Sequence, residues 1–101
     1  MADENVIIYA TLTPQPGKEA ELETLLRGMC APSRAESGCV VYDLYRSTKN
    51  GTFHFFEIWK TQADIEAHRE EPHFKNFRAS LGDLTEGPPV PDFLERIDSR
   101  T

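Results

Sequence analysis

Glu57 is the residue whose expected surroundings are most unusual for its type. It lies in Thr52–Lys60, a run of β-branched and aromatic residues that predicts a strand. Since side chains alternate along a strand, Glu57 shares one face with Phe55 and Trp59. A carboxylate in apolar surroundings has its charged form disfavoured, so it must find a partner or keep its proton. Glu57 is therefore either a pocket acid or hydrogen-bond acceptor, or a carboxylate held by a buried arginine or a backbone amide.

His68 and His73 are the second group with chemical potential, and they flank Pro72. An imidazole titrates near neutral pH, so either histidine could act as a general base or a hydrogen-bond donor at the mouth of a pocket. Their spacing does not match the i, i+4 pairs of helical metal sites, and no third ligand is evident nearby in sequence. We therefore expect no metal here. The structural alternative is a solvent-facing His68 and a His73 that caps its own helix.

Other chemical motifs are weak or absent. Cys30 and Cys39 form no CxxC motif and are too few for a disulfide framework. Cys30 lies on the apolar stripe of a predicted helix and is expected in the core, whereas Cys39 could be reactive but has nothing nearby in sequence to activate its thiol. The sequence contains no phosphate-binding glycine loop, no Ser/His/Asp order and no dinucleotide fingerprint. The residues alone therefore indicate only a small-molecule pocket or a binding module.

The elements that must position these groups follow one another in the order β-α-β-β-α-β. Leucines at helical spacing after Lys18 predict the first helix, which Pro32 should end or kink. Thr61 with Asp64 resembles a capping box at the start of the second helix, and Pro72 breaks that helix and starts another piece. The predicted strands are Val6–Thr13, Cys39–Arg46, Thr52–Lys60 and Phe93–Asp98, with an Asn50-Gly51 hairpin turn and a rigid connector over residues 87–91.

This order is the split βαβ arrangement of ferredoxin-like α+β domains, with a four-stranded antiparallel sheet and both helices on one face. The other face does not alternate with polar residues as a wet face would. It would expose Ile7, Tyr9, Phe56 and Ile58, and an apolar patch of that kind usually marks an interface. We therefore expect a homodimer in which two sheets pack face to face about a two-fold axis. The alternative is a distorted sheet that the chain's own tail partly covers.

Length and composition restrict the class of protein. With 101 residues, the chain is expected to form a single domain, residues 1–101. Its net charge of -6 argues against nucleic acid and anionic membrane surfaces as partners, since both require a basic patch. No stretch approaches the roughly 18 to 20 apolar residues that span a bilayer. The acidic start of the chain does not resemble a signal peptide, so a cytoplasmic location is expected.

Several short stretches, each weak alone but specific in their joint order and spacing, carry a family resemblance: Pro16-Gly17-Lys18, Glu36-Ser37-Gly38-Cys39 with Tyr42, Phe55-Phe56-Glu57-Ile58-Trp59, Ala63 through Glu66-Ala67-His68, and Pro72-His73-Phe74. In these stretches the chain resembles the antibiotic biosynthesis monooxygenase superfamily. Members of that superfamily are dimeric ferredoxin-like α/β-barrel proteins, and they include quinol monooxygenases and autoinducer-2-processing proteins. The resemblance covers most of the chain.

The resemblance implies a dimer with a pocket between sheet and helices in each protomer. It implies a monooxygenase that oxidises a small quinol or phenol with molecular oxygen and uses no metal, flavin or other cofactor. A deprotonated hydroquinone can itself give an electron to oxygen, so the protein must supply a base, a dry cavity and orientation.

The resemblance also assigns roles to residues. His68 or His73 would assist deprotonation, and Glu57 would orient a histidine or hydrogen-bond the substrate. The haem-degrading branch of the superfamily uses an asparagine on its first strand, where this chain has Tyr9 or Ala10, so haem degradation is disfavoured. The residues expected to wall the substrate pocket are Trp59, Tyr42, Phe55 and Phe77.

Two alternatives to a monooxygenase remain open, because a fold alone does not name a reaction. The first is processing or isomerisation of a small phosphorylated or oxidised metabolite, as in the autoinducer-2-processing proteins. The second is a non-catalytic module that sequesters a small aromatic ligand.

Overall fold

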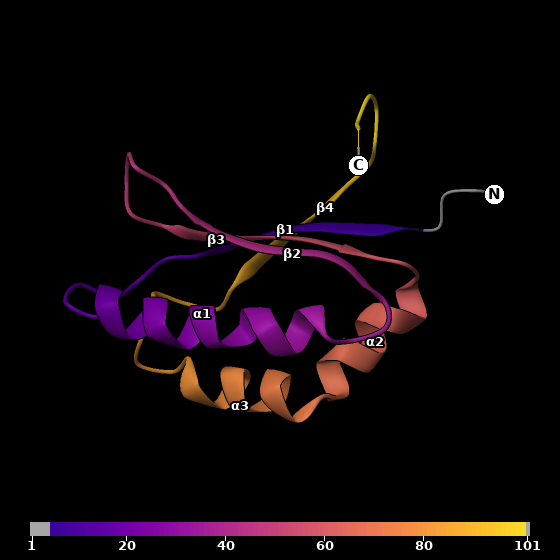
Figure 1. Ribbon diagram of the computed structural model, residues 1–101. Coiled ribbons are helices and arrows are strands. Elements are labelled where there is room, and N and C mark those ends of the chain that lie inside the picture. Colours follow the sequence, from indigo (N-terminus) through magenta and orange to yellow (C-terminus); the bar gives the residue numbers. More distant parts are fainter. Residues whose placement is uncertain (1–4, 101) are drawn as a thin grey trace.

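The fold, seen in a computed structural model, is one four-stranded sheet with three helices on one face (Figure 1). The structure describes residues 5–100; the first four residues, part of the start where no signal peptide is expected, lie outside the described residues, as does residue 101. Within the described part, no helix is long and apolar enough to cross a bilayer. The elements are β1 (Val6–Leu12), α1 (Glu19–Arg34), β2 (Cys39–Arg46), β3 (Phe53–Trp59), α2 (Gln62–Glu70), α3 (Pro72–Ser80) and β4 (Val90–Leu94).

The sheet has the strand order β2-β3-β1-β4, and every neighbouring pair is antiparallel. The predicted ferredoxin-like α+β fold is therefore confirmed, and the sheet is open rather than closed into a barrel within one chain. Thr61 caps α2 by accepting a hydrogen bond from the backbone of Asp64 at 3.2 Å, and Pro72 occupies the first turn of α3. Both predicted helix signals thus act as expected.

Two predicted boundaries are wrong, and both involve proline. Helix α1 does not end at Pro32, one of the two outcomes predicted there, but continues to Arg34. Pro32 lies in the last turn, so its missing N–H removes one backbone hydrogen bond near the end of the helix. The last strand is β4, Val90–Leu94, and not Phe93–Asp98. Pro91 pairs with Ala10 inside this strand, which is possible because β4 is at the edge of the sheet and a missing N–H there breaks no ladder. The connector predicted over residues 87–91 is correspondingly shorter.

The β2–β3 hairpin forms where Asn50-Gly51 predicts it, but with a longer loop. Gly51 has a positive φ of 77°, whereas no non-glycine residue among those described does. The loop is closed by hydrogen bonds from the backbone of Gly51 to Ser47 at 3.0 Å and from Ser47 to Thr52 at 2.8 Å. The loop therefore differs from a two-residue type I′ turn, which would place both central residues at positive φ.

The core lies between the sheet and α1. Strand residues of the helix-facing side, such as Leu12, Phe55 and Trp59, pack with Leu22 and Leu26 of α1, and all five side chains are almost fully buried. Cys30, expected in the core, is only half-buried at its margin.

The face of the sheet away from the helices is less exposed than predicted. Ile7 and Ile58 are already buried within the single chain. Tyr9 and Leu94 on that face remain 38% and 41% exposed. The segment after β4 turns away from the helix layer (Figure 1). A smaller apolar surface than the alternation suggested is thus left for a partner.

Candidate functional site

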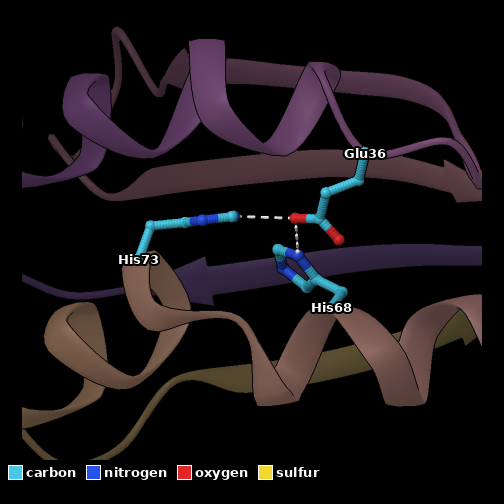
Figure 2. Close-up of side chains that lie close together, drawn as sticks. All are labelled: Glu36, His68 and His73. Atoms are coloured by element: carbon cyan, nitrogen blue, oxygen red, sulfur yellow. Dashed lines mark hydrogen bonds and ion pairs between the residues drawn. The ribbon is translucent and has the colours of Figure 1, made fainter.

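Three side chains from three different elements meet at one carboxylate oxygen (Figure 2). Oε2 of Glu36 lies 2.7 Å from Nδ1 of His68 and 2.7 Å from Nε2 of His73. Glu36 comes from the loop between α1 and β2, His68 from the last turn of α2 and His73 from the first turn of α3. Since an ionised carboxylate only accepts, each histidine must donate the N–H that faces it.

The break between α2 and α3 brings the two histidines together. Glu71 adopts an extended conformation (φ -69°, ψ 145°), and Pro72 starts the new helix directly after it. On one continuous helix, side chains five positions apart would lie on different faces. The break redirects the chain so that His73 returns to the carboxylate that also binds His68 (Figure 2). The helix break predicted at Pro72 is therefore what brings the two histidines to one carboxylate.

The loop that carries Glu36 is held against α2 and β3 by a close approach at Gly38. A Cβ added to Gly38 would collide with the side chain of Asp64 in the first turn of α2. The Gly38 carbonyl also accepts a hydrogen bond from the backbone of Lys60 at 2.9 Å. Only glycine fits this position, so the loop can lie close enough for Glu36 to reach both histidines.

His68 is the buried member of the cluster, with 1% of its surface exposed. Its ring packs on Trp59 with centroids 4.4 Å apart and contacts Phe74 at 5.0 Å. Burial lowers the pKa of His68, although Glu36 opposes that shift. The ring is therefore neutral near pH 7, and the proton held on Nδ1 by Glu36 leaves the lone pair on Nε2. A neutral, oriented imidazole of this kind can accept a proton from a bound molecule.

Glu57 forms a second buried polar pair with Trp59. The indole Nε1 donates to Oε1 of Glu57 at 2.9 Å, as side chains two apart on one strand can do. Burial raises the pKa of Glu57 to about 7, against the indole hydrogen bond and the charge of Arg69, which both lower it. A carboxyl group that titrates near neutral pH can donate or accept a hydrogen bond with little change in conditions.

A cavity of about 200 Å³ lies between the sheet and the α2–α3 pair. Its floor comes from β1, β2 and β3, and its far wall from α2, α3 and three prolines, two just before β4 and one inside it. Both Glu57 and His68 line it. The aromatic and proline residues around it are Tyr42, Phe55, Phe74, Phe77, Pro88, Pro89 and Pro91. This volume is below the roughly 300–1,000 Å³ of sites for drug-sized ligands, so it suits a single small ring.

The structure brings some of the predicted site residues to the cavity and sets others behind it. Glu57, His68, Tyr42, Phe55 and Phe77 line the cavity. Trp59 is fully buried and does not line the cavity, but it contacts Glu57 and His68, which do. His73 is likewise held at Glu36 and not at the cavity wall. The idea of a solvent-facing His68 is wrong.

Glu36 is the residue that sequence reasoning missed as a functional group. It was noted only as part of a matching stretch, and Glu57 was expected to orient a histidine. Glu57 instead bonds Trp59, and Glu36 takes the orienting position. Glu36 is 32 positions from His68 and 37 from His73 in sequence, so no spacing rule connects it to either histidine. The available signal was the position of Glu36 two residues before Gly38, in a predicted turn.

The same three residues bear on the question of a metal. Each offers one donor atom, and all three atoms lie within 4.8 Å of one another. Glu36 is therefore the third possible ligand, which is not evident from the sequence near the two histidines. Both nitrogens, however, are already committed to the one carboxylate oxygen. In this arrangement each imidazole donates to Oε2 of Glu36, so both would have to give up that N–H proton before a metal could bind all three atoms.

Comparison with known protein families identifies the family to which this chain belongs. Residues 5–80 match the family described as antibiotic biosynthesis monooxygenase. The chain belongs to this family. Antibiotic biosynthesis monooxygenase sequences thus cover the whole Glu36–His68–His73 cluster and the cavity floor, while β4 and the proline wall lie outside the matched range.

Individual relatives agree with this assignment. The chain is 37% identical to "Putative monooxygenase Rv0793" of Mycobacterium tuberculosis over 92% of each protein. It is 31% identical to "Putative monooxygenase YcnE" of Bacillus subtilis, over 82% of this chain and 88% of that one. Among solved structures, Rv0793 superposes with a TM-score of 0.90 at 35% identity, covering 96% of this chain and 99% of that one. PA3566 of Pseudomonas aeruginosa also gives 0.90, at 33% identity and with 97% and 99% covered.

Proposed function

We propose that this protein is a monooxygenase that oxidises a small quinol or phenol with molecular oxygen and needs no cofactor. The observation that carries the proposal is His68. Its ring lines a small aromatic cavity, is neutral near pH 7 and has its proton fixed on Nδ1 by Glu36. Family membership supports an oxygenase rather than another use of such a base. The cavity size supports a single-ring substrate.

In the proposed reaction, a substrate hydroxyl gives its proton to Nε2 of His68. The resulting electron-rich anion passes an electron to oxygen, and the two radicals join at a ring carbon. Loss of water then leaves the product, so one oxygen atom enters the ring and the other becomes water. A phenol plus oxygen gives a quinone plus water, and the ring supplies all four electrons. Glu36 stabilises the imidazolium formed in the first step, as the carboxylate of a catalytic triad does.

Glu57 and the aromatic walls have supporting roles in this proposal. Glu57 faces the cavity beside His68 and would hydrogen-bond the second oxygen of the substrate. Tyr42, Phe55 and Phe77 would hold the ring by apolar contact and exclude water, which strengthens the polar interactions at the reacting end. His73 and Trp59 act through Glu36 and Glu57, as positioning residues.

Oxygen uptake with a panel of hydroquinones and phenols, in buffer treated to remove metals and flavins, tests the proposal. We expect uptake well above autoxidation for at least one single-ring substrate. His68→Gln should lower it by at least about a hundredfold, the usual contribution of a general base. Uptake at the autoxidation rate across the panel, or equal uptake by His68→Gln, would overturn the proposal.

The same panel separates the alternatives. Proton exchange at a substrate carbon without oxygen consumption would indicate an isomerase or metabolite-processing enzyme. Tight binding of an aromatic compound with no turnover would indicate a binding module.

We also propose that the protein is a homodimer that packs sheet to sheet. Tyr9, Val90 and Leu94 on or beside the open face are exposed apolar side chains, which supports such a partner. Light scattering at micromolar concentration should give twice the chain mass. A monomer there would contradict this proposal, and Tyr9→Glu should shift a dimer toward monomer because it places a charge in the interface.

A further inference from the structure

Two arginines at the cavity, Arg69 and Arg78, have no hydrogen bond or ion pair with any other residue in the range 5–100. Arginines elsewhere in the helices and strands are compensated. Arg27, Arg34 and Arg46 lie 2.7, 3.5 and 2.9 Å from a carboxylate oxygen. The two arginines without a hydrogen bond or ion pair therefore both line the cavity that the proposed reaction uses, and Arg69 is close enough for its charge to act on Glu57.

These arginines stand at the solvent side of the cavity. Both are exposed, whereas Glu57 and His68 at the other side are 7% and 1% exposed. The guanidinium of Arg78 lies 5.9 Å from the centre of the Phe74 ring, which holds its plane beside the aromatic lining. The cavity thus has a buried inner end that can accept a proton and a cationic outer end.

The whole molecule does not provide this positive charge. Its net charge of -6 repels an anion at long range, so any anion preference must come from local contacts. A guanidinium presents a planar fork of N–H donors that matches a carboxylate. Two such forks beside one aromatic cavity can recognise an acidic ring substrate at its outer end.

We propose that the substrate is an aromatic acid: a ring whose phenolic hydroxyl faces His68 and whose carboxylate is bound by Arg69 and Arg78. The orientation of the hydroxyl rests on the proposed function, whereas the carboxylate site is a claim about binding alone. It narrows the substrate class from any small quinol to quinols and phenols that carry an acidic group.

Calorimetric titration under nitrogen, where no oxygen is available for turnover, tests the carboxylate site. The probes are 4-hydroxybenzoate and 4-hydroxybenzamide, which share a ring and a hydroxyl and differ in charge. We expect the wild-type protein to bind the acid about tenfold more tightly. Arg69→Gln with Arg78→Gln should reduce that ratio to about one. Arg27→Gln, the matched change on α1, should leave it unchanged, and circular dichroism checks that each variant is folded.

Failure of this inference is distinguishable from failure of the proposed reaction. Equal binding of the two probes, no binding of the acid, or a ratio that survives in the double variant would overturn the carboxylate site. A tenfold preference in a protein that oxidises no quinol would keep the site and reject the reaction. Oxygen uptake with neutral quinols but no preference for the acid would do the reverse.

Discussion

Two cavities flank the core, and they differ in how their charges are balanced. The larger, of about 370 Å³, lies between α1 and β2 and has Glu23, Arg27 and Arg46 on its walls. Glu23 binds both of these arginines, at 2.7 and 2.9 Å. The smaller cavity, of about 200 Å³, buries a glutamate away from any ion pair and leaves two arginines without one among the described residues. Incomplete compensation, and not size, distinguishes the candidate site.

The glutamates of the two cavities show the effect directly. Hydrogen bonding from Arg27 lowers the pKa of Glu23, which lies at the surface. Burial raises the pKa of Glu57 to about 7. The pKa values of two glutamates thus shift in opposite directions within one small domain, because Glu23 is hydrogen-bonded to arginines whereas burial outweighs the charge of Arg69 at Glu57.

Of the substitutions that compare the two cavities, Glu36→Gln should have the largest effect on activity. The glutamine amide can donate to Nδ1 of His68 and so favour the tautomer that carries its proton on Nε2. We expect kcat for oxygen uptake to fall about a hundredfold with little change in KM. Glu23→Gln, the same change at the other cavity, should leave both constants unchanged. Equal kinetics for the two variants would show that Glu36 does not orient the base.

The pH dependence of stability should separate Glu57 from Glu23. The folded pKa of Glu57, about 7, lies above its ordinary value of 4.5, so the folded state holds the proton more tightly and stability falls as pH rises between these values. Glu57→Gln should remove that fall and be about 1–3 kcal/mol more stable than wild type at pH 8, with little difference at pH 4.

Glu23→Gln should act in the opposite direction. The pKa of Glu23 is lowered in the folded state, so its contribution is present above its ordinary pKa and lost as pH falls. The loss should be small because Glu23 lies at the surface, where its side chain is 27% exposed and water screens its ion pairs. Urea unfolding at pH 4 and pH 8 measures both variants, and parallel pH curves for the two would contradict the difference in environment.

Ala10→Val should give the smallest effect. Ala10 lies on the floor of the inner cavity, and two added methyl groups would reduce the space for a ring. We expect KM to rise about fivefold with kcat nearly unchanged. Leu44→Phe, which adds volume at the other cavity, should leave KM as it is. If both variants behave like wild type, the substrate does not occupy the inner cavity.

Much of the fold could be predicted because its signals are local. The bounds of β2 and the cap at Thr61 follow from residue types and short spacing. The start of β4 could not be predicted in this way, since a proline such as Pro91 normally argues against a strand. It is acceptable here because β4 is at the edge of the sheet. Whether a proline interrupts an element depends on its neighbours in space, which no sequence window contains.

The site was predicted less completely for the same reason. Glu57 was identified by its type and strand face and His68 by its type and the family resemblance, and both line the cavity. Glu36 was not, because it meets His68 only after the α2–α3 break and the close approach at Gly38 have placed it. The proline-rich segment over residues 87–91 was expected to affect the shape of the pocket, but its position could not be predicted, since a connector shows no pattern that tells which side of the molecule it will cover.

Trp59 is the chain's single tryptophan, and its indole donates to Glu57, whose pKa burial raises to about 7. Tryptophan fluorescence therefore comes from one known place, where the indole contacts the ring of His68 and is hydrogen-bonded to Glu57, which lines the cavity. Emission should change as Glu57 gains or loses its proton and again when a molecule enters beside it. The fold thus contains an intrinsic optical indicator, and the inner cavity can be followed in the unmodified protein without a label.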